Sequence, residues 1–437
     1  MLLLWFFLLT CLAAAAEKLV QVSAPEFQEI TQIIVSNITE ITSPPLNPRQ
    51  EIETLNLQHR LSRRTGKWNA SHPRHRLLMA LYGFSRYKQL NLAETKKSRD
   101  MYKHVPKAQK NLVEKVIGYT KKLNTVEHLF EENNFLAADV LREGMEYYGI
   151  SQEELDAFIK DMEKDKKNPD RTSVVQAMKH FVRDWSEEGR FEREGAFRCI
   201  LSNLEGLERS DEKPLRLLAP GAGAGRLGYE IDALGGFEVT INEWSAYMNL
   251  VHRYAAQIPT SNSISYHPYI DWWSHHATAS DMQRSVIFPD WTPRTMPLNS
   301  SLVMVEGDFS TVFHDTNFET YDIIVTLFFI DTARNLMSYL ETIHRLLKSG
   351  GTWINLGPLL YGTGPWLQLS VDEILKVSEE LGFVFAVDGE EEGVCGFLTP
   401  GDGLEGKTRS LYVPYAQNER GLSRNAYDAQ FWRARKV

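Results

Sequence analysis

Residues 219–226 read APGAGAGR, a stretch with glycine at three alternate positions. It stands between a short apolar run at 215–219 and a segment with helical spacing at 226–234. Glycines at alternate positions let the backbone adopt positive φ and approach a ligand closely. The following helix offers unpaired N–H groups to polar atoms of that ligand. The stretch therefore predicts a glycine-rich binding loop between a strand and a helix.

The spacing of the glycines narrows the class of ligand. A dinucleotide-binding loop reads G-x-G-x-x-G and would need glycine where this chain has Arg226. The G-x-G-x-G pattern that starts at Gly221 and continues through Gly223 to Gly225 instead resembles the loop of Rossmann-like S-adenosylmethionine methyltransferases. A tight strand–helix turn without a ligand is the alternative interpretation.

Around this loop, short apolar runs alternate with helical patterns from residue 215 onward. Further strands are expected at 237–241, 302–305, 321–330, 352–356, 383–387 and 429–434. Helices are expected at 226–234, 335–347 and 371–381, with a turn at 348–351. Such alternation predicts an α/β fold with a parallel sheet.

The chain before residue 206 has a different pattern. Apolar positions recur every three or four residues at 74–92 and 106–165, among many charged side chains. Residues 161–171 are polar and predict a loop, after which Ser173 is expected to cap a helix. The apolar stripe of that helix consists of Val174, Met178, Phe181 and Trp185. We therefore expect a helical region at 17–206 and a second domain at 207–437.

Residues 1–16 read MLLLWFFLLTCLAAAA, too short for a membrane span but similar to the apolar part of a secretory signal. No basic residue precedes the run, so an uncleaved or misassigned N-terminus is the alternative. Sequons at Asn37, Asn69 and Asn299 would permit glycosylation, although a few such triplets arise by chance. The expected location is the secretory pathway, or the cytosol or nucleus if the leader does not function.

Composition excludes several classes of protein. The chain has 437 residues, 43% of them hydrophobic, which is ordinary for a globular protein of two or three domains. Its 48 basic and 57 acidic side chains give a net charge of −9, which argues against binding nucleic acid through a broad basic face. Three cysteines are too few for a disulfide framework or a four-cysteine zinc site, and weakly favour a reducing compartment. No ligand spacing predicts a metal.

Two acidic residues follow the next two predicted strands. Glu243 lies 22 residues after Gly221, where a carboxylate can accept hydrogen bonds from ribose hydroxyls. Asp308 could accept from an adenine amino group while Phe309 packs on the ring. Ligands bind at the carboxyl ends of strands in open α/β sheets, so these positions predict an adenosyl site.

Four longer segments closely resemble the carnosine N-methyltransferase family. They read PGAGAGRL at 220–227, NEWS at 242–245, FFIDTA at 328–333 and GTWINLGPLLY at 351–361. The resemblance implies a Rossmann-like class I methyltransferase domain after a helical N-terminal region. It also implies methyl transfer from S-adenosylmethionine to an imidazole nitrogen of carnosine, a small-molecule substrate, to give anserine.

The resemblance places the cofactor contacts on positions of this chain. They are His180, Arg183, Gly221, Gly223, Gly225, Glu243, Asp308, Phe309 and Leu327. His180 stands where the family usually has glutamine, and Leu327 where cysteine is common. Because His180 and Arg183 share a helix face, they are expected to act together as a lid.

On the substrate side, the resemblance places the acid that holds the imidazole at Asp331 and further substrate contacts at Tyr361 and Tyr427, with Asp331 and Tyr427 as the catalytic residues. A carboxylate there can accept the N–H of one ring nitrogen and leave the other free to attack. The alternative role for Asp331 is to cap the following helix. Gly362 replaces a family histidine that lies against the imidazole, which puts carnosine itself in doubt. Another amine, a protein histidine, or adenosyl binding without catalysis are the alternative functions.

Overall fold

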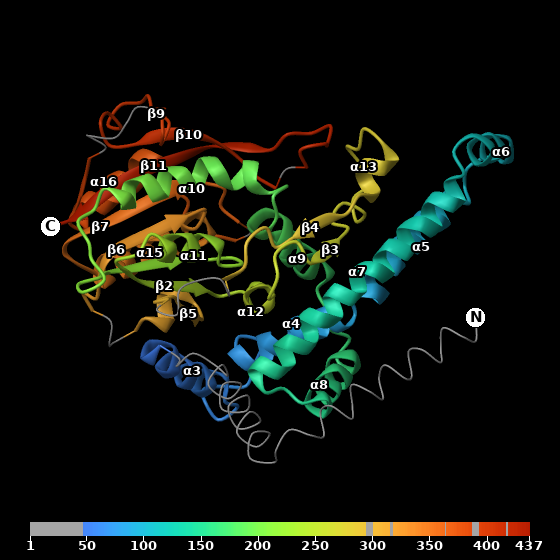
Figure 1. Ribbon diagram of the computed structural model, residues 1–437, viewed down its shortest axis with the longest axis horizontal. Helices are drawn as coiled ribbons and strands as arrows, with labels where there is room; N and C mark the ends of the chain where they lie inside the picture. The colour runs from blue at the N-terminus through green and yellow to red at the C-terminus, as the bar shows by residue number, and fades with distance from the viewer. Residues whose placement is uncertain (1–46, 294–299, 315–317, 363, 387–392, 417) are drawn as a thin grey trace, which may run out of the picture. The chain divides into compact units, whose positions relative to one another are not determined.

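The computed structural model describes residues 47–293, 300–314, 318–362, 364–386, 393–416 and 418–437 (Figure 1). Within it, Arg49–Val437 form one compact unit. The leader at 1–16 and the sequons at Asn37 and Asn299 lie outside the described residues. The domain boundary expected at residue 206 stays a prediction. None of the described helices is long and apolar enough to cross a bilayer.

The helical region predicted before residue 206 is confirmed. Its helices are α3 (Pro48–Leu61), α4 (Pro73–Ser85), α5 (Tyr87–Tyr102), α6 (Lys107–Val116), α7 (Tyr119–Tyr148), α8 (Gln152–Lys164), α9 (Arg171–Trp185) and α10 (Arg190–Glu205). The stripe of α9 that runs from Val174 to Trp185 is buried as expected. The cap is different: the Asp170 carboxylate accepts from the Ser173 N–H at 3.0 Å, so α9 begins two residues before Ser173. A carboxylate also suits the positive end of the helix dipole.

The second half of the unit is built on one sheet with the order β5-β2-β1-β6-β7-β11-β10-β9. Its strands are β1 (Leu215–Pro220), β2 (Phe237–Glu243), β5 (Val303–Glu306), β6 (Tyr321–Leu327), β7 (Leu347–Gly357), β8 (Phe383–Phe385), β9 (Phe397–Leu398), β10 (Arg409–Pro414) and β11 (Ala426–Lys436). The five neighbouring strands β5, β2, β1, β6 and β7 are parallel. Strand β11 pairs antiparallel with β7, β8 and β10. The predicted Rossmann-like α/β fold is confirmed. The chain order reverses at β1, where open sheets of this kind bind ligands.

Two predicted boundaries are corrected. Strand β6 ends at Leu327 rather than at residue 330, because Phe328 adopts a φ of 51° and a 3-10 helix, η2 (Ile330–Thr332), follows. The turn expected at 348–351 lies inside β7. Its pairing with β6 is irregular there, since Tyr321 opposes Leu347 while Ile323 opposes Thr352. The small hairpin of β3 (Ile264–Tyr266) and β4 (Val286–Phe288) was not predicted.

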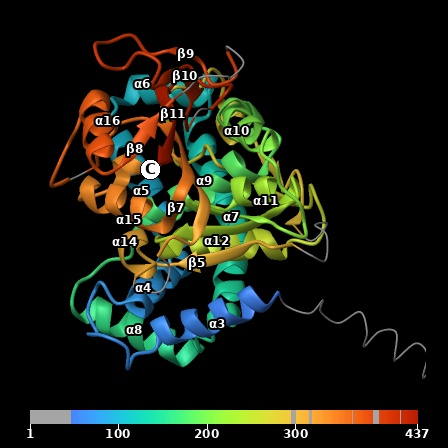
Figure 2. The ribbon, with the colours of Figure 1, turned by 90° about the vertical axis from the view of Figure 1, so that its left-hand side faces the viewer.

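Alternate residues of the strands fill two hydrophobic cores, one on each face of the sheet. Leu217 packs in a core with residues of α9, α10, α11 (Arg226–Ala233) and α12 (Ala246–Gln257). Leu218 packs in the other core, with residues of α14 (Phe309–Val312), α15 (Leu336–Leu346) and α16 (Val371–Glu380). Figure 2 shows α14, α15 and α16 on one side of the strands and α10 and α11 on the other. The first core continues into α4 and α7, so the helical region and the sheet share buried side chains.

A disulfide joins Cys199 on α10 to Cys395, which lies two residues before β9. Both side chains are buried. The cysteine count excluded a framework of several disulfides but did not predict this single bond. The bond fixes the sheet edge near β9 to the helix that covers it.

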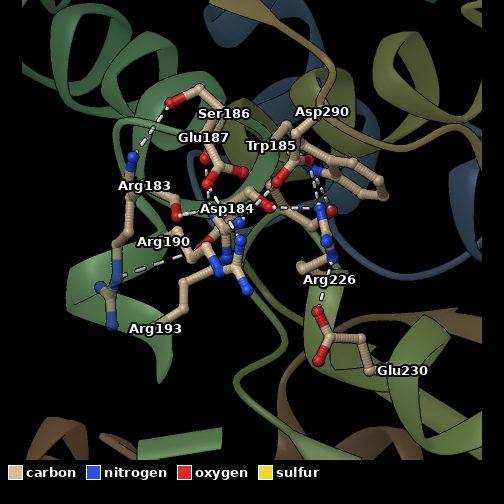
Figure 3. Close-up of polar contacts among 12 residues, drawn as sticks. Arg183, Asp184, Trp185, Ser186, Glu187, Arg190, Arg193, Arg226, Glu230 and Asp290 are labelled. Atoms are coloured by element: carbon tan, nitrogen blue, oxygen red, sulfur yellow. Dashed lines mark hydrogen bonds and ion pairs between the residues drawn. The ribbon is translucent and has the colours of Figure 1, made fainter. Parts of the chain in front are cut away.

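A buried network of charges holds α9, α10 and the start of α11 together (Figure 3). The Asp290 carboxylate accepts from Arg193 of α10 and from Arg226 of α11, each at 2.6 Å. Arg193 also donates to the main-chain oxygens of Arg183 and Ser186, at 2.6 and 2.9 Å. Since side-chain exposure is 5% for Arg193 and 11% for Asp290 and Arg226, water screens this network little.

We expect Asp290→Asn to lower the free energy of unfolding by about 3–5 kcal/mol, because two buried guanidinium groups lose the carboxylate that they share. Urea denaturation at pH 7 measures this. Glu187→Gln is the matched control, because the ion pair between Glu187 and Arg190 is exposed to solvent. Equal losses in the two variants would contradict a dominant role for Asp290.

Candidate functional site

A cavity of about 650 Å³ opens at the carboxyl ends of β1, β2 and β6. Its walls come from α9, the glycine loop, the residues after β2, β5 and β6, the start of α15, and Trp366 and Tyr415. The cavity therefore lies where the strand order reverses. This is the position predicted for an adenosyl site.

The glycine loop adopts the expected conformation. Gly221, Gly223 and Gly225 have φ values of 71°, 56° and 88°. A Cβ atom on Gly221 would collide with the ring of Phe329, and one on Gly225 with His252. Gly221 and Gly223 line the cavity, whereas Gly225 caps α11 beneath it.

Two buried rings hold the loop from behind through the main-chain oxygen of Ala224. Trp185 Nε1 donates to this oxygen at 3.2 Å, and His252 Nδ1 lies at the same distance. Burial lowers the pKa of His252 to about 3, so the imidazole is neutral and its Nδ1 carries the hydrogen. The loop is thus preorganised by side chains from α9 and α12.

Glu243 lines the cavity at the end of β2 and is held by main-chain donors. Gly223 N donates to Oε2 at 2.9 Å and Ser245 N to Oε1 at 2.7 Å. Burial raises the pKa of Glu243 above its ordinary value, although these N–H groups oppose that effect. The predicted acid is therefore inside the cavity and next to the glycine loop.

Asp308 and Phe309 also line the cavity. Asp308 Oδ1 accepts from the N–H and the hydroxyl of Ser310, at 2.9 and 2.6 Å, and so caps α14. Phe309 is buried and packs edge-on against Phe329 and Tyr339, with ring centroids 5.3 and 5.4 Å apart. These aromatic side chains form an apolar wall beside the two carboxylates.

His180 and Arg183 both line the cavity, and their expected action as a lid stays a prediction. His180 Nδ1 lies 2.7 Å from Asp184 Oδ2. Although burial opposes ionisation, His180 and Arg183 hold the pKa of Asp184 below its ordinary range. Arg183 Nε lies 3.2 Å from Glu192 Oε1 and 3.9 Å from Asp184 Oδ1. Its guanidinium lies 4.4 Å from the ring centre of Tyr415. Leu327 lines the cavity at the end of β6, as predicted.

Asp331 lies in η2, just beyond the cavity lining to which its neighbour Thr332 belongs. Its side chain is buried, and Oδ2 accepts from the Leu360 N–H at 2.9 Å. Burial raises the pKa of Asp331 to about 6, against the effect of the Leu360 bond. The acid therefore joins the end of β6 to the segment after β7, rather than only capping a helix.

The two predicted tyrosines differ in their surroundings. Tyr361 Oη donates to the Leu369 carbonyl at 2.7 Å and accepts from its N–H at 3.0 Å, so the hydroxyl is engaged with main chain. Tyr427, on β11, contacts the rings of Phe328 and Tyr415, with centroids 5.9 and 5.6 Å apart. Neither tyrosine is among the residues that line the cavity.

Sequence reasoning assigned no role to four residues at the site. Phe328 and Tyr415 line the cavity and stack at 5.0 Å. Trp244 also lines it, and the Arg76 guanidinium of α4 lies 3.5 Å from the centre of its ring. No local pattern marks Tyr415 or Arg76, because the fold brings them from distant parts of the chain. Trp244 follows Glu243 directly, which was an available signal.

The described residues hold no group of three His, Cys, Asp or Glu side chains arranged to bind a metal. The sequence-based expectation that no metal is bound stays a prediction.

Comparison with known proteins identifies the family. The carnosine N-methyltransferase family profile matches residues 160–437. The carnosine N-methyltransferase of Mus musculus is 37% identical over 245 residues, 53% of this chain and 59% of the mouse protein. That of Schizosaccharomyces pombe is 30% identical over 286 residues, 61% of this chain and 75% of the yeast protein. The chain thus matches well under two thirds of the mouse protein's length.

Among solved structures, Haemonchus contortus phosphoethanolamine N-methyltransferase 2 in complex with S-adenosyl-L-methionine is 13% identical, with a TM-score of 0.31. It covers 49% of this chain and 42% of its own. The assignment of the fold therefore depends on the strand order of the chain itself. With the profile extending over more than half of its residues, the chain belongs to the carnosine N-methyltransferase family.

Proposed function

We propose that the chain is an S-adenosylmethionine-dependent N-methyltransferase that acts on the imidazole of carnosine or a related histidine-containing small molecule. One observation carries the proposal. The cavity at the reversal of strand order joins the glycine loop and Glu243 to the end of β6, next to the buried carboxylate of Asp331. This arrangement supports an adenosyl site next to an acid that can hold an imidazole.

The residues present fit S-adenosylmethionine, which when bound supplies an electrophilic methyl group on a sulfonium. Glycine adopts the positive φ values of this loop without strain. It also has no side chain, so the ligand can approach the backbone closely. Each oxygen of Glu243 accepts from one main-chain N–H group, so the carboxylate is held in place. Its remaining lone pairs are suited to accept from ribose hydroxyls. Phe309 and Leu327 offer apolar surface for a purine ring.

Asp331 would select the reactive form of the substrate. At pH 7 its carboxylate is mostly ionised, since the pKa is about 6. It can accept the N–H of one imidazole nitrogen, which leaves a lone pair on the other nitrogen. It then stabilises the positive charge that the ring acquires on methylation. Phe328, Tyr415 and Tyr427 supply flat aromatic surface nearby.

A second candidate substrate class is favoured by Gly362. The family histidine expected there is absent, and a Cβ at this position would meet nothing within 4 Å. Gly362 is exposed and lies outside the cavity lining, so it is the missing family side chain that favours this class, whose candidates are another amine or a protein histidine. Adenosyl binding without catalysis is less consistent with the presence of Glu243, Asp308 and the buried Asp331 together.

We expect Asp331→Asn to lower kcat/KM by about 10²–10⁴-fold, because the amide cannot orient and stabilise the imidazole in the same way. Binding of S-adenosylmethionine, measured by calorimetry, should change only a few-fold. At pH 7.5, the free energy of unfolding of the variant, measured by urea denaturation, should exceed that of the wild type by about 1–3 kcal/mol. This follows because the raised pKa means that ionisation of the buried acid opposes folding.

The pH dependence separates catalysis from structure. The stability contributed by protonated Asp331 is present below about pH 4 and is lost as the pH rises through about 6. Activity has the opposite sign, since Asp331 and the substrate imidazole must both be deprotonated. Below pH 6, a plot of log(kcat/KM) against pH should have a slope approaching two in the wild type, because two groups must lose a proton. In Asp331→Asn the slope should approach one, because only the substrate imidazole titrates. Identical slopes would contradict the assigned role.

We expect Gly362→His to raise kcat/KM for carnosine about tenfold, the value of one good hydrogen bond. The backbone tolerates the change, because Gly362 lacks a positive φ and its Cβ position is open. Radiolabelled methyl transfer to carnosine and to a panel of imidazole compounds measures this, with Gly362→Ala as control. A loss of carnosine turnover in Gly362→His, with another substrate preferred by the wild type, would favour the second substrate class.

We expect Arg76→Ala to raise the Kd for S-adenosylmethionine about 5–10-fold, while kcat at saturating cofactor changes less than twofold. The guanidinium covers Trp244 and donates to its carbonyl at 2.6 Å, interactions worth about 1–1.5 kcal/mol together. Arg74→Ala is the matched control, because Arg74 is also on α4 but pairs with Glu154. Equal effects of the two variants on Kd would contradict a specific role for Arg76.

A further inference from the structure

The buried disulfide between Cys199 and Cys395 bears on the compartment in which this chain folds. The two cysteines are 196 residues apart in sequence, and their Cα atoms lie 4.9 Å apart in the core. Their side chains are 0% and 1% exposed, so the bond is enclosed by the protein. Structural disulfides persist in oxidising compartments and are rare in the cytosol. The bond is therefore evidence for an oxidising folding environment, independent of the leader expected at 1–16.

A second feature points to the same environment. Asn69 begins the sequon Asn69-Ala70-Ser71, in the segment between α3 and α4, and all three residues are exposed. Asn69 Oδ1 accepts from the N–H and from the hydroxyl of Ser71, at 2.9 and 2.6 Å. The acceptor asparagine and the hydroxyl residue of the sequon are thus already in contact. An exposed sequon of this kind is an acceptor for an N-linked glycan in a secreted protein.

The position of Asn69 is compatible with an active protein. Asn69 does not line the cavity, and nor do Ala70 and Ser71. A glycan on Asn69 would therefore modify no residue that lines the cavity.

We propose that the chain matures in the lumen of the secretory pathway, where Asn69 is N-glycosylated and Cys199 and Cys395 are oxidised. The two thiols transfer two electrons and two protons to a disulfide-bearing oxidoreductase, which becomes a dithiol. The Asn69 amide nitrogen bonds to the anomeric carbon of a lipid-diphosphate-linked oligosaccharide. The sugar–phosphate bond breaks, the lipid diphosphate leaves, and the amide loses one proton. This proposal is independent of the methyl-transfer activity.

The glycan is tested with the full chain and its own leader, expressed in a eukaryotic host. The other two sequons are first removed as Asn37→Gln/Asn299→Gln, so that only Asn69 remains as an acceptor. We expect this variant to shift in mobility on treatment with an endoglycosidase specific for N-linked glycans. Ser71→Thr should retain the shift, whereas Ser71→Ala and Asn69→Gln should each lose it. A double variant that carries no glycan overturns the proposal.

The disulfide is tested on the same purified double variant, in which both cysteines and Asn69 are intact. Free thiols are blocked under denaturing conditions, and the protein is digested without reductant. We expect one peptide pair that links Cys199 to Cys395 and separates on reduction. Blocked thiols at both positions overturn the proposal, whatever the result of the methyl-transfer assay.

Discussion

The site depends on one buried carboxylate, that of Asp290, and on the two arginines that it neutralises. Arg226 is the first residue of α11, where the helix dipole places a partial positive charge. A guanidinium there is unfavourable unless acids compensate it, and Asp290 and Glu230 accept from it at 2.6 and 2.7 Å. The N–H groups of the glycine loop can then serve a ligand without a neighbouring uncompensated charge.

The same carboxylate also connects the loop to α9. Through Arg193, it is linked to the main-chain oxygens of Arg183 and Ser186 at the end of that helix. Because α9 also carries His180 and Trp185, one network sets both a wall of the cavity and the support of the loop. The two acids proposed to meet ligands, Glu243 and Asp331, are by contrast held by main-chain N–H groups. Acids held in this way keep lone pairs for hydroxyl and N–H donors of a ligand.

The sequence predicted the parts of this arrangement that depend on local pattern. The loop at 219–226, the acids after β2 and β5 and the alternation of strands and helices all lie where their spacing indicated. The end of β6 was predicted too far along, because nothing local reveals the positive φ of Phe328. Tyr415 and Arg76 reach the site only through the C-terminal strands and α4. The disulfide was missed for the same reason, since 196 residues separate its cysteines.

The bond between Asp331 and Leu360 fixes the acid through the main chain. Leu360 donates through its main-chain N–H, so this bond does not depend on which side chains occupy the segment after β7. Gly362, two residues later, has open space around its Cβ position. A side chain can therefore be added or removed at 362 without moving the Asp331 carboxylate, which is proposed to orient the substrate imidazole. Under the proposed function, loss of the family histidine would therefore alter substrate selectivity while the glycine loop, Glu243 and Asp331 keep their positions.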